Sequence, residues 1–285
     1  MKKKLLLCLV VALMSCLAAS AQDAKTQPLT FWYEYVINPG KESQFLDLVK
    51  TVGAPVRDKL MADGVVLAWG VEVPLLREPG GATHLIWYSV ADLASVDKVD
   101  AVMRAQIAKL DEEATKTGVT KKGAAPAGGI SSRIQEVADM SKTRDYLTRD
   151  LVFVTGTGAP PAGVLPWVRY NFAKAKPGKA AEFRRTWEKY NKAVLDKLVA
   201  DGTILAYGFS VEEVRTDGDF THYVWYATKD LAGMDKVRAA FMADRDKRSQ
   251  EEQDVITAEF AKVLDLDASR SEIARSIIFK VGGMK

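Results

Sequence analysis

The sequence predicts an α+β fold in which two tandem ferredoxin-like βαββαβ units pack sheet to sheet as an intramolecular pseudo-dimeric α+β barrel. Three observations favour this fold: an internal repeat, an order of elements that recurs in both copies, and strands that are apolar on both faces. The chain has 285 residues, of which 48% are hydrophobic. That length and composition suit a globular protein with two domains of ordinary size.

The internal repeat becomes visible when the sequence is shifted by 138 positions. Residues 39–99 then match residues 177–237 at 27 of 61 ungapped positions, far more than composition alone would produce. A repeat of this strength indicates two homologous domains. We expect these domains at 28–154 and 166–285, joined by a Gly- and Pro-rich linker at 155–165. The shift later falls to 126, and the extra residues of the first copy are expected in an exposed loop at Lys121–Gly129.

Each copy has the element order strand, helix, strand, strand, helix, strand. The first strand, Phe31–Ile37, is aromatic and apolar, and Pro39 with Gly40 ends it. This order is that of a split βαβ unit, an antiparallel four-stranded sheet with helices on one face. The other strands are predicted at Val65–Val73, Thr83–Val90 and Leu147–Val154 in the first copy, and at Thr203–Val211, Thr221–Thr228 and Ile273–Val281 in the second.

The helices are predicted from apolar residues spaced three or four positions apart. Pro55 interrupts the first helix and predicts a kink there, whereas the second copy has Ala193 at this position. Gly64 and Gly202 predict where the first helix of each copy ends. The stripes of the first copy are Phe45, Leu48, Val52, Val56 and Leu60, followed by Leu93, Val96, Val99, Met103, Ile107 and Leu110.

The strands are apolar on both faces, which predicts how the two units combine. In the second strand, Leu67, Trp69 and Val71 alternate with Ala68 and Gly70. Helices cover one face of each sheet, and an uncovered second face would be a large apolar patch. We therefore expect the two sheets to face each other and to enclose a shared cavity.

Residues 1–21 have the pattern of a signal peptide. Lys2–Lys4 form a positive start, Leu5–Met14 is an apolar run too short to span a bilayer comfortably, and Ala19-Ser20-Ala21 fits a cleavage site. An alternative is a lipoprotein box with Cys16 as the lipidated residue. Both interpretations predict export, to the periplasm or outside the cell. No later apolar run reaches the length of a transmembrane helix.

The formal net charge of +3 comes from Lys2–Lys4 alone, so the remainder of the chain has 37 basic and 37 acidic residues. This balance argues against nucleic acid as a partner. Both cysteines, Cys8 and Cys16, lie in the predicted signal. After cleavage at Ala21 the chain would therefore have no disulfide, thiolate nucleophile or cysteine metal site.

The repeated motifs resemble the NIPSNAP-type pattern of the dimeric α+β barrel superfamily, over roughly residues 30–115 and 167–245. The resemblance implies a ferredoxin-like barrel that often pairs through its sheets, so a homo-oligomer is an expectation. Relatives in that superfamily include cofactor-free monooxygenases, haem-degrading enzymes and haem-binding peroxidase-like proteins. No haem-ligand motif is present that could be carried over residue by residue. The motifs are Pro39-Gly40-Lys41, Phe45, Thr83–Tyr88 and Asp92–Ala94, repeated as Pro177-Gly178-Lys179, Phe183, Thr221–Tyr226 and Asp230–Ala232.

His84 and His222 are the only histidines, and they occupy equivalent positions at strand starts. Because side chains alternate along a strand, each shares a face with a phenol, Tyr88 or Tyr226. Beside a cavity between the sheets, these imidazoles could act as an acid or base, or as haem ligands. The alternative is plain packing, in which each histidine satisfies backbone groups at the strand end or orders the preceding turn. One histidine per copy is too few for a three-ligand zinc site, so no metal site is predicted.

The candidate ligand-binding residues are aromatic and polar side chains within strands. The aromatic ones could line a pocket, although aromatics at strand spacing also form ordinary core. The polar ones would converge on an apolar cavity if they face the inside of the barrel, and would mean nothing special at a solvent-exposed edge. Tyr33 aligns with Asn171, so the copies either do different jobs or have drifted. The candidates are Glu34, Trp69, Trp87, Arg169, Asn171, Tyr207 and Trp225.

The leading hypothesis for function is an exported protein that binds a small, largely apolar molecule between its sheets, without a cofactor or a firm catalytic signature. The alternative is a barrel-type oxidoreductase or monooxygenase, cofactor-free or haem-dependent, that uses His84 or His222 with a nearby Tyr or Trp. A scaffold or assembly module is a second alternative. No G-x-S-x-G elbow, P-loop or EF-hand loop occurs.

Overall fold

The structure, a computed structural model, describes residues 27–117, 129–156, 164–216, 218 and 220–282. Within these residues, eight antiparallel strands close into one barrel in the order β1-β3-β2-β8-β5-β7-β6-β4. The predicted signal peptide at 1–21 lies outside the described residues. So do most of the predicted linker at 155–165 and almost all of the loop at Lys121–Gly129.

The elements follow the predicted order, with one further helix in each half. The strands are β1 Leu29–Tyr35, β2 Val66–Pro74, β3 His84–Val90, β4 Arg144–Thr155, β5 Trp167–Ala175, β6 Ala206–Glu212, β7 His222–Thr228 and β8 Leu264–Val281. The α-helices are α2 Glu42–Leu48, α3 Ala54–Ala62, α4 Leu93–Thr117, α5 Ile130–Val137, α6 Ala180–Trp187, α7 Ala193–Ala200, α8 Leu231–Arg245 and α9 Gln250–Val263. Three short segments complete the chain: η1 Val49–Gly53, η2 Met140–Lys142 and η3 Glu188–Lys192.

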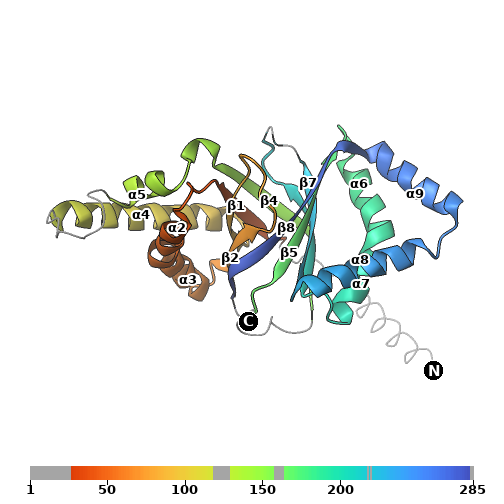
Figure 1. Cartoon of the computed structure of the whole chain (residues 1–285), viewed down its shortest axis with the longest axis horizontal. Coiled ribbons are helices and arrows are strands. Elements are labelled where there is room, and N and C mark those ends of the chain that lie inside the picture. The colour runs from red at the N-terminus through yellow and green to blue at the C-terminus, as the bar shows by residue number, and fades with distance from the viewer. Residues whose placement is uncertain (1–26, 118–128, 157–163, 217, 219, 283–285) are drawn as a thin grey trace, which may run out of the picture.

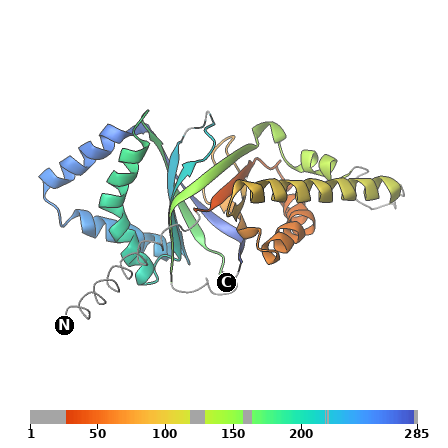
Figure 2. The same ribbon diagram turned by 180° about the vertical axis from the view of Figure 1, so that it is seen from behind.

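The barrel lies between two groups of helices (Figures 1 and 2). Helices α2–α5 of the first half cover one side of it, and α6–α9 of the second half cover the opposite side. Each half contributes four neighbouring strands, in the orders β4-β1-β3-β2 and β8-β5-β7-β6. The halves are joined where β2 pairs with β8 and where β4 pairs with β6, and we call these two junctions the seams.

Strands that are apolar on both faces are explained by three separate cores. One core lies under the helices of the first half, one lies under those of the second half, and one fills the barrel. In β2, Trp69 and Val71 belong to the first core, whereas Glu72 points into the barrel. The expected closure of the strands into a barrel is confirmed. It is achieved by curvature and hydrogen bonding at the seams rather than by two flat sheets pressed together.

The first helix of each half is interrupted by a π-helical segment, η1 in the first and η3 in the second. An interruption therefore occurs beside Pro55, as expected, but it also occurs beside Ala193 in the second half, so the proline is not its cause. Pro55 lies in the first turn of α3, where a missing N–H breaks no helical hydrogen bond. Gly64 and Gly202 end these helices as predicted, with φ of 74° and 76°. No helix among the described residues is both long and apolar enough to cross a bilayer.

Candidate functional site

At each seam a buried carboxyl group accepts hydrogen bonds inside the barrel, Glu72 at one seam and Asp150 at the other. Glu72 is fully buried, and its Oε1 accepts a hydrogen bond of 2.9 Å from the indole N–H of Trp87. Its Oε2 accepts one of 2.9 Å from the hydroxyl of Tyr170. At the other seam, Asp150 accepts hydrogen bonds from Ser210 and from the indole N–H of Trp225.

The repeat relates the two seams to each other, but the carboxyl and the serine stand at exchanged positions in them. Glu72 is the register partner of Ser276, and Asp150 is the register partner of Ser210. In the repeat, Glu72 corresponds to Ser210 and Asp150 corresponds to Ser276. Each seam therefore holds one carboxyl and one serine, contributed by opposite halves. Burial raises the pKa of Glu72 to about 7 and that of Asp150 to about 6.

The space between these groups is filled by aromatic side chains. Trp32 lies at 5.4 Å from Tyr170 and 6.2 Å from Tyr223 between ring centroids. Only about 20 Å³ remains free, with Glu34 among the lining residues, and that volume holds about one water molecule. A ligand bound between the sheets has no room there, because Trp87, Trp225 and their neighbours fill the interior. The expected shared internal cavity is therefore present only as this small space, which residues of both halves line.

Both histidines lie on the other face of the sheet, beneath the helices. The His84 ring is 5.0 Å from Phe45 of α2, and the His222 ring is 5.3 Å from Phe183 of α6. Each is almost completely buried. Neither lies beside a cavity between the sheets, which corrects the location expected from the sequence.

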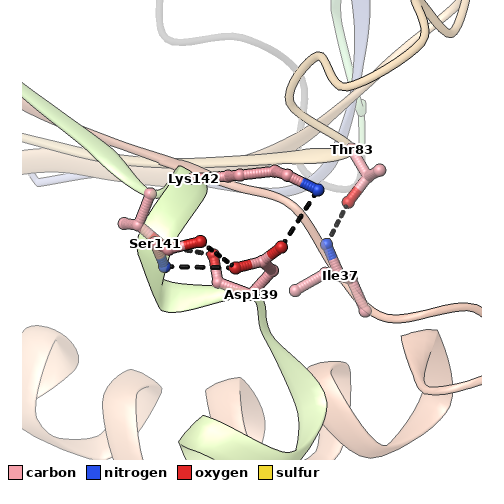
Figure 3. A network of polar contacts seen from close by, with 6 residues as sticks. Ile37, Thr83, Asp139, Ser141 and Lys142 are labelled. Carbon is pink, nitrogen blue, oxygen red and sulfur yellow. Dashed lines mark hydrogen bonds and ion pairs between the residues drawn. The ribbon is translucent and has the colours of Figure 1, made fainter.

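The residue before each histidine orders the strand start. Thr83 accepts a hydrogen bond of 2.8 Å from the backbone N–H of Ile37, and its hydroxyl lies 3.1 Å from His84 Nδ1. Figure 3 shows the contact between Ile37 and Thr83 beside a second turn, in which Asp139 accepts from Ser141 and pairs with Lys142. Thr221 makes the same contacts for the second half. This geometry supports the packing interpretation of the histidines.

We expect the histidines to make the protein sensitive to acid. Burial lowers the pKa of both imidazoles to about 4, below the ordinary value of 6.5. The unfolded chain therefore binds these protons first, and the stability is present above pH 6.5 and lost as the pH falls through 4. Replacing both His84 and His222 with glutamine should reduce the loss of unfolding free energy between pH 7 and pH 4.5 by about 2 kcal/mol per site. Urea denaturation at the two pH values measures this, and an unchanged acid sensitivity would contradict it.

Trp69 and Tyr207 are also on the helix side and are fully buried. The indole N–H of Trp69 donates to Asp58 at 3.0 Å, and the Tyr207 hydroxyl donates to Asp196 at the equivalent position. Each ring thus ties a strand to the preceding helix. Neither residue lines the hollow described next.

A hollow lies in the second half, between the outer face of the barrel and α6–α9. Its volume is about 410 Å³. The walls are mostly apolar and aromatic, with Phe183 and Trp187 of α6, Phe241 of α8 and Phe260 of α9. Two of the predicted residues, Asn171 of β5 and Tyr226 of β7, line it as well. A hollow of this size and character is typical of sites for small apolar molecules.

Asn171, Ser271 and Arg270 supply polar groups to this hollow, and Arg169 contacts the first two from beside it. Arg169 Nε donates to Asn171 Oδ1 at 3.1 Å, and its Nη2 donates to Ser271 at 3.2 Å. Burial raises the pKa of Tyr226, while the charge of Arg169 and its hydrogen bond act in the opposite direction. Arg270 lies at the rim with its guanidinium 4.0 Å from the centre of the Phe172 ring. Arg169 and Asn171, expected as polar ligand residues beside Glu34, and Tyr226, expected as a partner of His222, thus lie together on the outer face of the barrel.

In the first half the same compartment is occupied by larger side chains. Tyr33 and Tyr35 correspond to Asn171 and Ala173, and Arg57 corresponds to Leu195. Arg57 is 7% exposed, and Tyr88, the counterpart of Tyr226, is 1% exposed. The repeat thus places one open and one filled compartment on opposite sides of the barrel.

Sequence reasoning missed Glu72, Asp150 and Arg57. Glu72 is a charged residue in an otherwise apolar strand, whereas Asp150 follows Arg149 in a strand of mixed character and stands out less. Arg57 stands where the second copy has Leu195, so a charge replaces an apolar residue at an equivalent helical position. These residues can be recognised as unusual only when the two copies are aligned or when the buried face of the strand is known.

Comparison with known proteins shows which fold this is. No family model matches the sequence, and none of the curated proteins matches it significantly. A candidate monooxygenase from Fusobacterium nucleatum has a TM-score of 0.56 at 12% identity, covering 90% of this chain and 95% of its own. A candidate monooxygenase from Lactobacillus acidophilus has a TM-score of 0.52 at 10% identity, covering 90% and 97%. The α+β fold with its closed antiparallel barrel is similar to the fold of these two proteins. At these identities the likeness concerns the fold alone.

Haem is an alternative cofactor that the sequence left open, and the side chains that line the hollow can be compared with known haem ligands. No histidine, cysteine or methionine lines the hollow, and His222 packs against Phe183 outside the lining. The phenol of Tyr226 is the one side chain there with haem-ligand chemistry, and its raised pKa disfavours the phenolate. The lining thus does not fit haem. No cluster of three metal-ligating side chains occurs among the described residues.

Proposed function

We propose that this protein binds a small, largely apolar molecule in the hollow of its second half. The observation that carries the proposal is the 410 Å³ hollow itself, which the first half fills and the second leaves open. Leaving such a space empty would forfeit packing contacts, so a bound molecule is the expected use for it. Asn171 and the arginines beside it would orient a polar group on the ligand.

The test fills the hollow without changing any side chain in the barrel interior. Ala173 lines the hollow and corresponds to Tyr35 of the first half, so Ala173→Tyr introduces the side chain that the first half already carries. The probe is 1-anilinonaphthalene-8-sulfonate, an apolar fluorophore with one anionic group. We expect the wild-type protein to bind it and enhance its fluorescence, and Ala173→Tyr to weaken the affinity at least tenfold.

The matched control is Ala105→Tyr, which adds the same ring at an exposed position on α4. It should bind the fluorophore as the wild type does, and near-ultraviolet circular dichroism should show both variants natively folded. Equal affinity of Ala173→Tyr and wild type would refute the site. Native mass spectrometry of the purified protein then identifies any molecule that remains bound.

A barrel-type oxidoreductase is the second candidate, favoured by the two solved structures of the same fold that are described as candidate monooxygenases. Tyr226 would be the side chain nearest to a substrate, since it lines the hollow and His222 does not. Oxygen uptake with a quinol substrate, lost in Tyr226→Phe, would support it. Absence of uptake, together with no Soret band after addition of haemin, would leave binding alone.

The organisation of the chain is part of the proposal. We propose that the halves are tandem ferredoxin-like units, 28–154 and 166–285, of a NIPSNAP-like protein, and that residues 1–21 direct export. The strand orders β4-β1-β3-β2 and β8-β5-β7-β6 support the tandem units. Lipidation at Cys16 is the alternative to cleavage after Ala21. Pairing of two chains is a further hypothesis, which light scattering tests. A scaffold role is the remaining alternative.

A further inference from the structure

The hollow of the second half is apolar where it is buried and polar where it meets solvent. Its buried lining includes Phe183, Trp187 and Leu195, each at most 3% exposed. Ser269 and Ser271 of β8 line it as well, and both are exposed. No aspartate or glutamate is among the described residues that line it. A molecule that fits this hollow therefore has an apolar body and a polar group that stays near the surface.

Arg169 of β5 lies at the polar edge of the hollow. Its Nε donates to Asn171 and its Nη2 donates to Ser271, and both acceptors are neutral side chains that line the hollow. In the sheet, Arg169 is the register partner of Tyr226, another lining residue. None of the ion pairs formed by the described residues includes Arg169. These contacts thus hold a positive charge beside the hollow without an acid to balance it.

The two halves differ in charge at this place. In the repeat, Arg169 corresponds to Phe31, and Ser271 corresponds to Asp145. Phe31 packs against the core of the first half. Asp145 and Ser271 occupy equivalent register positions opposite the first strand of their halves. The filled compartment therefore has an acid at this position, whereas the open hollow has a base. A positive charge beside an open hollow is complementary to an anion.

Aromatic rings make up much of the apolar lining. Phe183 and Trp187 of α6, Phe241 of α8 and Phe260 of α9 all take part. The rings of Phe183 and Phe260 lie edge to face, with their centroids 6.5 Å apart. Aromatic rings gain from offset or edge-to-face contacts with one another beyond the burial of area. The lining therefore favours a flat ring system over a flexible alkyl chain.

We propose that the molecule bound in this hollow is an aromatic carboxylate, with its rings among the aromatic side chains and its carboxylate held by Arg169. This inference rests on the proposed function and names the class of ligand. A guanidinium presents parallel N–H donors that match the two oxygens of a carboxylate. The hydroxyl of Ser271 would donate to the same anion. At the exposed edge the carboxylate keeps part of its hydration, which limits the cost of binding it.

The experiment compares 2-naphthoate with 2-naphthamide, which has nearly the same shape and no charge. Dissociation constants are measured at pH 7.5 by ligand-detected NMR on the purified protein. We expect the wild type to bind naphthoate at least tenfold more tightly than naphthamide, because hydrogen bonds to a charged group are stronger than those between neutral groups. Octanoate, which carries the same head group on an alkyl chain, should bind more weakly than naphthoate.

A matched pair of variants at Ser271 tests the role of charge. Ser271→Asp introduces the acid that the first half has at this position and gives Arg169 a counter-ion. It should weaken the binding of naphthoate at least tenfold and leave the binding of naphthamide unchanged. Ser271→Asn has nearly the same shape without the charge, and it should keep the preference for naphthoate. The position is exposed, so both variants should fold.

Replacement of the arginine tests the same contact from the other side. Arg169→Met removes the charge and keeps an apolar stem, so its affinity for naphthoate should fall to its affinity for naphthamide. Arg185→Met, at an exposed position on α6, removes the same charge elsewhere in the second half and should bind both ligands as the wild type does.

Equal affinities of the wild type for naphthoate and naphthamide would overturn this inference and leave the proposed function standing. Equal effects of Ser271→Asp and Ser271→Asn on naphthoate would overturn it as well, even if Arg169→Met does not fold. Octanoate binding as tightly as naphthoate would exclude the aromatic class. If the wild type binds none of the three molecules, the proposed function falls together with the inference.

Discussion

Replacement of Glu72 with glutamine is expected to raise the unfolding free energy at pH 8 by about 2 kcal/mol, with little change at pH 5. Burial raises the pKa of Glu72 from 4.5 to about 7. The native state therefore keeps a proton that the unfolded chain releases between these values. The stability from this group is present below pH 4.5 and lost as the pH rises through 7. Glutamine is neutral at every pH and removes that loss.

The measurement is the difference in unfolding free energy between wild type and Glu72→Gln, by urea denaturation at pH 5 and pH 8. Both proteins contain the two histidines, whose effect on stability has the opposite pH dependence. The difference between the proteins therefore cancels that effect. Glu112→Gln, at an exposed position on α4, is the matched control and should show no such dependence. A difference that is the same at both pH values would contradict the buried, protonated carboxyl.

Glu72→Ala should behave differently from Glu72→Gln. It removes the acceptor of both the Trp87 indole and the Tyr170 hydroxyl, and it leaves a void. Two orphaned donors and the void should cost about 2–5 kcal/mol at pH 5. A smaller loss of unfolding free energy for Glu72→Ala than for Glu72→Gln would show that these hydrogen bonds do not stabilise the seam.

Truncation of Trp69 to alanine is expected to destabilise the protein by about 3–5 kcal/mol. The ring is fully buried in the core between β2 and the helices of the first half, and its N–H donates to Asp58. Trp69→Phe should cost less, about 1–2 kcal/mol, because an aromatic ring still fills most of the space and Asp58 keeps its ion pair with Lys280.

Leu67→Ala is the matched control for Trp69, because Leu67 is on the same strand and 41% exposed. It should cost under about 1 kcal/mol. Fluorophore binding in the second-half hollow should be unchanged in Trp69→Phe. A stable Trp69→Ala protein with altered ligand binding would instead support the original interpretation of Trp69 as a ligand residue.

The candidate site shows where strand alternation was informative and where it was not. Alternation correctly paired His84 with Tyr88 and His222 with Tyr226 on one face, and the structure places all four on the helix side of the barrel. Alternation does not say which face is inside, however, because both faces here are apolar. The predicted residues were therefore divided between the barrel interior, which holds Glu34, Trp87 and Trp225, and the helix side, which holds the rest.

The sequence by itself determined that the chain is duplicated and that each half runs strand, helix, strand, strand, helix, strand, because identities at one fixed spacing and local periodicity are both properties of the order of residues. Only the tertiary structure determined that the barrel interior is full and that the free volume lies outside it. Free volume depends on how side chains of distant segments fit together. Asn171, Ala173 and Leu195 leave a space in one half that Tyr33, Tyr35 and Arg57 occupy in the other.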